Sequence, residues 1–237
     1  MTASPSSFPP DGLAVVIGAS GGIGSALTAA IEKADCFARV LPLSRSVDGL
    51  DITDEHSIAQ AARTTLGLGL PVRLVVVATG LLHTGEMRPE KTWRQLDADA
   101  LARSFAVNAS GPALVAKHFL PLLPRSGKAV FAALSAKVGS IGDNHLGGWY
   151  GYRAAKAALN QLMHTAAIEL RRTHPEAICI TMHPGTVATG LSAPFTAPSH
   201  PADPPDLAAA RLLAVIERTR PIDSGQMLDY TGIPLSW

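Results

Sequence analysis

Short apolar runs alternate with longer amphipathic segments along most of the chain. The apolar runs predict buried strands at residues 13–17, 38–44, 72–80, 128–135 and 177–185. The segments between them carry apolar residues at three- and four-residue spacing, which is typical of helices that cover one face of a sheet. Because the strands are apolar throughout and alternate with helices, they indicate a parallel sheet buried on both faces. The pattern predicts an α/β fold of the doubly wound class.

The same periodicity locates the helices. Apolar residues recur at helical spacing over residues 22–34, roughly 93–119, roughly 152–172 and 206–218. The chain has neither an internal repeat nor a clear interdomain linker. We therefore expect a single domain over residues 11–237, with helices on both faces of the sheet.

Two segments fall outside this alternation. Residues 1–10 are rich in proline and serine, and we expect them to form a loose tail. The second segment is the proline-rich stretch 192–205. Irregular stretches of this length inside a compact domain are usually functional or disordered. We interpret residues 190–205 as a flap that covers a binding site.

Composition and charge narrow the class of protein. The 237 residues are 47% hydrophobic and 16% charged, which is enough apolar material for a sizeable core. Twenty basic and nineteen acidic residues leave a formal net charge of +1, which gives no support for binding to nucleic acid or to an anionic membrane. No apolar run approaches the ~20 residues of a membrane span, and the first residues lack a signal-peptide pattern. We expect a cytoplasmic protein without nucleic-acid or membrane partners.

Nothing in the sequence favours a metal site. Cys36 and Cys179 lie far apart and match no metal-ligand spacing, so we interpret them as reduced thiols. The eight histidines include no H-E-x-x-H motif and no clustered pair. His183 precedes a Pro-Gly pair and could touch a cofactor pocket, although a packed or solvated histidine is the simpler interpretation. We predict that the protein binds no metal.

A glycine-rich turn follows the first predicted strand. The sequence VVIGASGGIGSAL places Gly18, Gly22 and Gly24 between that strand and the first helix. A turn without Cβ atoms lets backbone N–H groups approach a pyrophosphate, and the helix N-terminus adds partial positive charge. No Lys-Ser/Thr pair follows, which excludes the phosphate-binding loop of NTPases. A purely structural turn is the alternative, but the position of the motif favours dinucleotide binding in a Rossmann fold.

The end of the second strand bears on which dinucleotide is bound. About twenty residues after the glycines, where an acidic side chain would bind a ribose 2′-hydroxyl, the sequence has Ser44 and Arg45. An arginine can pair with a 2′-phosphate through charge-assisted hydrogen bonds. A solvated surface arginine is the alternative. The sequence thus favours NADP(H) as the cofactor, with NAD(H) as the second choice.

From about Leu13 to the C-terminus the chain resembles the classical short-chain dehydrogenase/reductase family. The likeness is carried by VVIGASGGIG, LDITD, VVVATG, FAVNASGP, YRAAK and HPGTVAT, which occur in the order of the family's motifs. The stretch VGSIGDNHLGGWYGYRAAKAALN is similar to the C-factor and sniffer-type carbonyl reductases within that family. Ile17 stands in place of the family's threonine, and Thr79 departs from its N-N-A-G motif.

The resemblance implies a set of cofactor contacts in the glycine turn, at the strand ends and on the helix that follows the fourth strand. They are Gly18, Ser20, Gly22, Ile23, Gly24, Ser44, Arg45, Asp51, Ile52, Ala78, Gly80, Tyr152, Lys156, Pro184, Gly185, Val187 and Thr189. The short step from Arg45 to Asp51 also fits the subgroup. It predicts no helix between the second and third strands.

The resemblance also implies four catalytic residues, namely Tyr152, Lys156, Ser135 and Asn108. Tyr152 and Lys156 match the Y-x-x-x-K motif. Asn108 matches the family's asparagine, which would hold a water molecule and Lys156 in a proton relay.

The family's serine has two candidates in this chain. Spacing to Gly139 puts Ala136 in the aligned position, with Ser135 just before it and Ser140 beyond it. We take Ser135 as the catalytic serine and Ser140 as its substitute. The loss of one oxyanion donor typically slows a reaction by about 10²–10³-fold.

The spacing of Tyr152 and Lys156 fits the chemistry of carbonyl reduction. A hydride added to a carbonyl leaves an alkoxide that needs a proton, which a tyrosine can supply. Lys156 lies one helical turn along on the same face, where its charge is expected to lower the pKa of the phenol. Tyr150 has Ala154 at the same spacing and is expected only on the pocket wall.

These features together predict an NADP(H)-preferring oxidoreductase that reduces a ketone or aldehyde, or oxidises the alcohol. Leu191 and Phe195 of the flap favour a largely hydrophobic small-molecule substrate. The family resemblance implies a homo-oligomer, either a dimer or a tetramer. The alternative function is a non-catalytic NAD(P)-binding signalling or sensor protein on the same fold.

Overall fold

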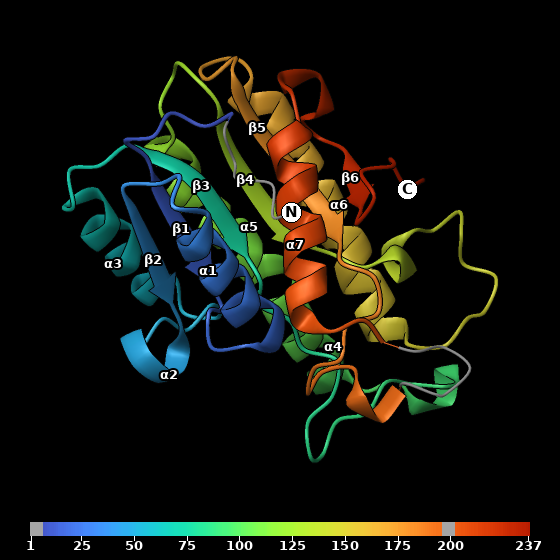
Figure 1. Cartoon of the computed structure of the whole chain (residues 1–237). Coiled ribbons are helices and arrows are strands. Elements are labelled where there is room, and N and C mark those ends of the chain that lie inside the picture. Colours follow the sequence, from blue (N-terminus) through green and yellow to red (C-terminus); the bar gives the residue numbers. More distant parts are fainter. Residues whose placement is uncertain (1–6, 196–201) are drawn as a thin grey trace.

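The computed structural model describes residues 7–195 and 202–237. Its centre is a parallel sheet with the strand order β2-β1-β3-β4-β5-β6 (Figure 1). The strands are β1 Leu13–Ile17, β2 Arg39–Leu43, β3 Val72–Val77, β4 Ala129–Leu134, β5 Ala177–His183 and β6 Met227–Asp229. This order confirms the predicted doubly wound α/β fold, because the chain runs outward from β1 in one direction and from β3 in the other.

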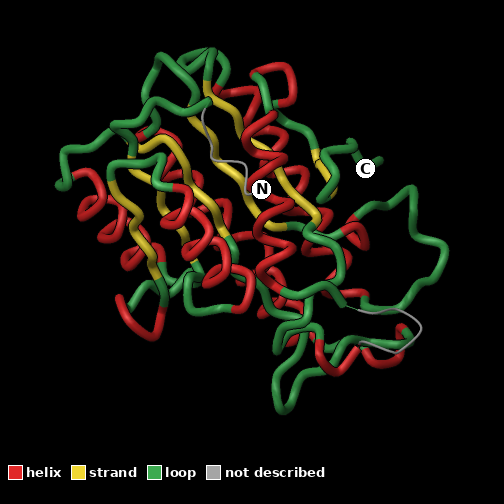
Figure 2. Tube along the Cα trace, in the orientation of Figure 1, coloured by secondary structure: helices red, strands yellow, loops and turns green. Residues whose placement is uncertain are grey.

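The helices lie on both sides of the sheet (Figures 1 and 2). They are α1 Gly22–Ala34, α2 Arg45–Asp48, α3 Glu55–Leu66, α4 Ala98–Phe105, α5 Gly111–Phe119, α6 Tyr150–Leu170 and α7 Pro205–Arg218. One hydrophobic core joins the sheet to α3, α5 and α6, and the other joins it to α1 and α7.

Alternation along each strand divides the side chains between these two cores. In β1, Leu13, Val15 and Ile17 face the core under α3, α5 and α6, whereas Ala14 and Val16 face α1 and α7. All five residues are fully buried. This is why the strand reads as a continuous apolar run rather than as an alternating one.

The predicted helix over residues 93–119 is interrupted. A short turn at Trp93–Gln95 precedes α4, and a wider π-helical turn at Ala106–Ser110 separates α4 from α5. The buried Asn108 occupies this wide turn, and Gly111 follows it. A Cβ atom on Gly111 would lie 2.6 Å from the carbonyl oxygen of Ile52, so the helix approaches that loop as closely as glycine allows.

The prediction that no helix joins the second and third strands was wrong. The four-residue α2 occupies the short step after β2, and α3 then connects to β3. Asp54 begins α3, because its carboxylate accepts a hydrogen bond from the backbone N–H of His56 at 2.9 Å. The three-residue β6 was not predicted, since its apolar run is too short to register as a strand.

The two irregular segments lie partly outside the described residues, namely residues 1–6 of the expected tail and 196–201 of the expected flap. In the remainder of the tail, Phe8 is buried, with its ring centre 5.2 Å from that of Phe37. The two ends of the flap are joined at its base, where Ala188 N–H donates to Asp203 O at 2.9 Å and Asp203 N–H to Thr186 O at 2.8 Å.

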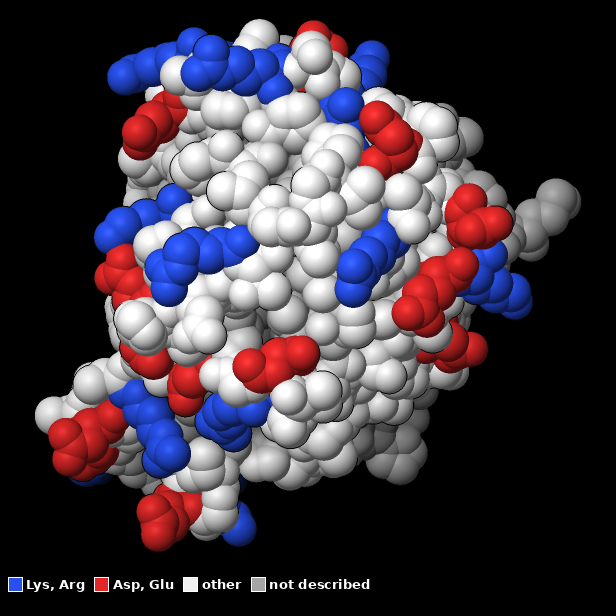
Figure 3. Space-filling view, turned by 90° about the vertical axis from the view of Figure 1, so that its left-hand side faces the viewer, with Lys and Arg blue, Asp and Glu red and all other residues white. Residues whose placement is uncertain are grey.

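The surface carries both signs of charge. On the face shown in Figure 3, acidic and basic side chains are interspersed between broad uncharged areas. Across the described parts of the chain, the search for a helix apolar enough and long enough to cross a membrane finds none. Within the same residues, no three His, Cys, Asp or Glu side chains gather in a way that could hold a metal ion.

Candidate active site

A cavity of about 880 Å³ opens at the carboxyl ends of the strands. It extends from the glycine turn after β1, past the ends of β2 and β3, to the end of β5 and the start of α6. In parallel α/β sheets, ligands bind in this crevice, next to the point where the strand order reverses. All of the predicted cofactor residues line the cavity except Gly24.

Gly24 lies behind the wall of the cavity and shapes it. A Cβ atom at this position would be 2.2 Å from the carbonyl oxygen of Gly18, so only glycine lets α1 pack this closely on the turn. Gly18 has a φ of 87°, which also favours glycine. The N-cap residue Gly21 supplies no side-chain hydrogen bond to α1. The helix N-terminus therefore keeps free N–H groups for an anionic ligand.

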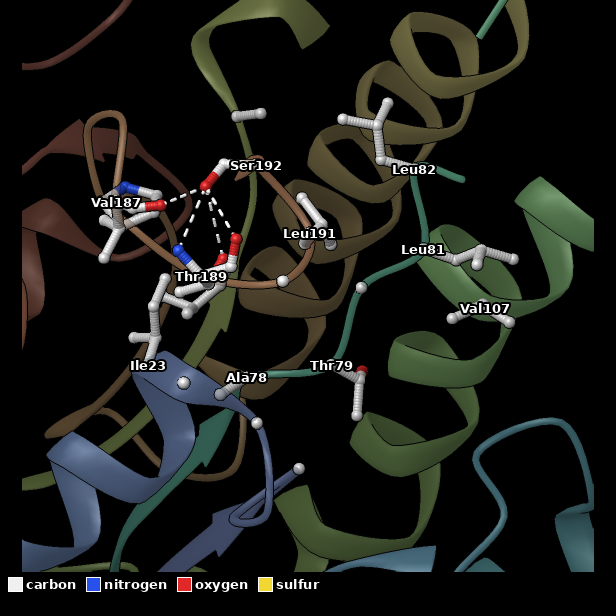
Figure 4. A pocket seen from close by; sticks show the side chains of 18 of the residues that line it. Ile23, Ala78, Thr79, Leu81, Leu82, Val107, Val187, Thr189, Leu191 and Ser192 are labelled. Atoms are coloured by element: carbon white, nitrogen blue, oxygen red, sulfur yellow. Dashed lines mark hydrogen bonds between the residues drawn. The ribbon is translucent and has the colours of Figure 1, made fainter. Parts of the chain in front are cut away.

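The opposite walls of this part of the cavity come from the ends of β3 and β5 (Figure 4). Thr79 and Leu81 lie on one side, and Val187 to Ser192 on the other. The Ser192 hydroxyl holds its wall together by hydrogen bonds to Val187 and to Thr189. The Thr79 hydroxyl is buried and has no hydrogen-bond partner among the described residues. Such an orphan group fits a site that binds a polar ligand.

The end of β2 carries mixed charges. Ser44 caps α2, since its hydroxyl accepts a hydrogen bond from Val47 N–H at 3.3 Å. The Ser44 N–H itself donates to the carboxylate of Asp48 at 3.0 Å, a contact that the sequence did not reveal. Hydrogen bonds from Thr53, and to a lesser degree the charge of Arg45, lower the pKa of Asp51. Arg45 thus shares this end of the cavity with the carboxylate of Asp51.

The start of α6 is fixed by a residue far away in sequence. Glu90 is buried, its carboxylate accepts a hydrogen bond from Gly151 N–H at 3.2 Å, and its carbonyl accepts one from Trp149 N–H at 2.5 Å. A negative charge at a helix N-terminus is favourable. A Cβ on Gly151 would be 3.0 Å from the Glu90 carboxylate, which explains the glycine between the two tyrosines.

Tyr152 and Lys156 both face the cavity from α6. The Lys156 amine lies 5.8 Å from the centre of the Tyr152 ring and donates a hydrogen bond to Leu134 O at 2.7 Å. Tyr150, which the sequence placed on the pocket wall, is 36% exposed and is not among the lining residues. The prediction that Tyr150 lies on the pocket wall was therefore wrong. Residues two apart on a helix point in different directions, so Tyr150 faces away from the cavity that Tyr152 lines.

Burial governs the ionisation of this pair. It raises the pKa of Tyr152 to about 12 and lowers the pKa of Lys156 to about 7. The expected lowering of the tyrosine pKa by the lysine charge is not found, because loss of solvation dominates both groups. The phenol therefore keeps its proton near neutral pH.

The two candidate serines have other partners. The Ser135 hydroxyl donates to Asn160 Oδ1 at 2.7 Å, although Ser135 does line the cavity. The Ser140 hydroxyl accepts a hydrogen bond from Asp143 N–H at 3.2 Å and lies outside the lining. Ala136 lines the cavity beside Ser135.

Asn108 is fully buried and does not line the cavity. Its side-chain oxygen accepts a hydrogen bond from Leu81 N–H at 3.0 Å, and its amide donates to Leu81 O at 2.7 Å. Both bonds brace the segment that follows β3. The role of Asn108 in a proton relay stays a prediction.

A chain of aromatic contacts runs from Tyr152 to the flap, and of its members beyond Tyr152 only Phe195 was singled out from the sequence. The Trp149 ring centre lies 6.2 Å from that of Tyr152 and 5.1 Å from that of Phe195, which belongs to the flap. His83 contacts Phe195 at 5.6 Å and the Gly190 carbonyl at 3.1 Å. The only sequence signal was the position of Trp149 before the tyrosines. The Trp149 side chain places an aromatic wall between α6 and the flap.

Comparison with known proteins gives a consistent picture. A family model described as short chain dehydrogenase matches residues 12–199. The 1-hydroxy-2-glutathionyl-2-methyl-3-butene dehydrogenase of Rhodococcus sp. (strain AD45) is 30% identical over 189 residues, which cover 80% of this chain and 79% of that protein. The C-signal protein of Myxococcus xanthus is 35% identical over 144 residues, or 60% of this chain and 81% of that protein.

Solved structures share the fold over nearly the whole chain. The carbonyl reductase Sniffer of D. melanogaster superposes with a TM-score of 0.77 at 20% identity, covering 96% of this chain and 99% of that one. Further structures with this fold contain NADP or NADPH.

Proposed function

Because the chain belongs to the short-chain dehydrogenase family of oxidoreductases, as its sequence predicted, we propose that it is an NADP(H)-preferring carbonyl reductase with Tyr152 as the proton donor. The observation that carries the proposal is the placement of Tyr152 and Lys156 side by side on the cavity wall, with the phenol protonated. The substrate is a hydrophobic ketone or aldehyde, bound beside the aromatic wall of Trp149 and Phe195.

The described residues fit a nicotinamide dinucleotide. The N–H groups at the start of α1 would bind its pyrophosphate, and the Thr79 hydroxyl is a free polar partner. Arg45 would pair with the 2′-phosphate, and Asp51 would bind the adenine amino group. When bound, a reduced nicotinamide supplies a hydride to the carbonyl carbon.

The protein's own residues handle the proton. As the carbonyl oxygen becomes an alkoxide, it takes the proton held on the Tyr152 hydroxyl, and solvent returns one to the phenolate. The charge of protonated Lys156 stabilises that phenolate. Lys156 would also bind the nicotinamide ribose, and Ser135 would steady the carbonyl only if its hydroxyl left Asn160.

The second candidate function is a non-catalytic NAD(P)-binding sensor. It is favoured by the likeness to the C-signal protein and by the engagement of Ser135 with Asn160. A pure binder needs no buried tyrosine and lysine on its cavity wall, so we prefer the enzyme. A homo-oligomeric assembly and a cytoplasmic location stay predictions.

A substitution of the proposed proton donor tests the function. Wild-type protein and Tyr152→Phe are assayed with NADPH against a panel of aldehydes, ketones and diketones. We expect kcat to fall by about 10²–10⁴-fold, the usual contribution of a positioned acid, while NADPH still binds. Tyr150→Phe is the matched control and is expected to keep its activity, since Tyr150 does not line the cavity. NADPH binding without turnover of any compound by the wild type would favour the sensor.

A further inference from the structure

The wall that follows β4, next to α6, shows no free serine hydroxyl among the described residues. Ser135 donates a hydrogen bond to Asn160, and Ser140 binds the Asp143 backbone outside the cavity. Ala136, Lys137 and Val138 line the cavity between them, with Ala136 next to Ser135. Carbonyl reduction builds negative charge on the oxygen, and a second donor beside Tyr152 would stabilise it. The question is which side chain supplies that donor.

His183 lies next to Ala136, on the part of the wall that lacks a hydroxyl donor. It ends β5, and the residue before it, Met182, accepts a hydrogen bond from Ser135 N–H at 2.7 Å. His183 and Ala136 therefore extend from adjacent strand ends, and both line the cavity. His183 Nδ1 is buried without a hydrogen-bond partner in the described parts of the chain. This leaves Nε2 as the ring nitrogen that can reach a ligand.

The surroundings of His183 keep its ring neutral. Its pKa is lowered to about 4, mainly by burial; the charge of Asp229 opposes this shift, and that of Lys137 contributes a smaller lowering. The Tyr230 ring packs at its side, 6.4 Å away. Because no described residue accepts a hydrogen bond from Nδ1, we assign the proton of the neutral imidazole to Nε2, which can then donate a hydrogen bond without losing that proton. A neutral histidine can polarise a carbonyl in this way.

We propose that His183 donates a hydrogen bond from Nε2 to the carbonyl oxygen of the substrate, in the position that a serine hydroxyl would otherwise fill. This inference rests on the proposed function. The hydride goes to the carbonyl carbon and the Tyr152 proton to the oxygen, whereas His183 keeps its proton throughout. Lys137 also lines the cavity, but its amine is half-exposed and forms an ion pair with Asp143 at 3.4 Å.

Removing the donor and restoring a hydroxyl tests the proposal. His183→Leu is expected to lower kcat by about 10²-fold, the cost of one oxyanion donor, with the dissociation constant for NADPH unchanged. Adding Ala136→Ser to this variant is expected to recover at least about tenfold of the loss. Thr181→Val is the matched control and is expected to keep kcat, because Thr181 lies two residues before His183 on the same face of β5 and is buried away from the cavity.

The results of these assays distinguish a hydrogen-bond donor role of His183 from a purely structural role. Unchanged kcat in His183→Leu would overturn the proposal, as would a loss that Ala136→Ser does not repair. His183→Gln keeps a side-chain N–H and is expected to retain most of kcat even where the leucine variant does not fold. A glutamine variant that binds NADPH yet loses as much as about 10²-fold would also overturn it. Absence of turnover by the wild type would instead overturn the proposed function.

Discussion

Tyr152 and Lys156 lose solvation in the same wall of the cavity, and each is driven toward its neutral form. Burial raises the pKa of Tyr152 to about 12 and lowers that of Lys156 to about 7. A protonated phenol can give its proton to a forming alkoxide, whereas alcohol oxidation requires the phenolate. The ionisation of this one residue therefore favours reduction at neutral pH.

The pH dependence of the two directions should differ for this reason. Reduction is expected to fall between about pH 6 and about pH 9, because Lys156, whose pKa is about 7, loses the charge that stabilises the forming phenolate, although the phenol itself stays protonated. Alcohol oxidation should rise throughout that range, since the phenolate fraction grows with pH. Initial rates in both directions, with Tyr152→Phe as the control, measure this. An oxidation rate that levels off below about pH 7 would show that the phenol pKa is lowered instead.

Sequence patterns pointed to Tyr152 and Lys156 because their spacing places them on one face of a helix and also matches the family's Y-x-x-x-K motif. They did not reveal why Gly151 separates the two tyrosines, since the reason is the carboxylate of Glu90 from a distant loop. The sequence likewise did not reveal the hydrogen-bond partners of Ser135 and Asn108, which are Asn160 and Leu81. Contacts between segments remote in sequence leave no periodic signal.

At the scale of elements, the strands and the glycine turn were predictable, because burial on both faces and close packing restrict the residues that can stand there. The interruption of the helix predicted over residues 93–119 was not predictable. Its wide turn depends on contacts with distant segments, namely that of Asn108 with Leu81 and that of Gly111 with Ile52. The helix α3 was missed because the step to Asp51 was taken as the whole connection, whereas the helix follows it.

The proposed cofactor preference rests on the junction of β2 and α2, where Arg45 lines the cavity. Arg45→Ala is expected to raise the dissociation constant for NADPH by about 10-fold or more and to leave that for NADH nearly unchanged, since only NADPH has a 2′-phosphate. Fluorescence titration with both cofactors measures the change. Arg39→Ala, at the exposed opposite end of β2, serves as the control. An equal change in both affinities would contradict the assignment to NADP(H).

On the scale of the whole molecule, one sheet brings the functional segments together. The carboxyl ends of its strands supply the glycine turn, the wall with Ala136 and His183, and the loop that leads into the flap. The aromatic contact between Trp149 and Phe195 joins that loop to the start of α6. The arrangement brings the proposed dinucleotide site and the proposed proton donor into one cavity, which a sensor would not need.

Isotope transfer tests the central claim most directly. The protein is incubated with NADPH deuterated at the transferred position of C4 and with a carbonyl compound that it consumes, and the alcohol is examined by mass spectrometry and NMR. We predict one deuterium on the carbinol carbon, with formation of this product slowed by about 10²–10⁴-fold in Tyr152→Phe. Bound NADPH that transfers no deuterium to any member of a broad carbonyl panel would contradict the account.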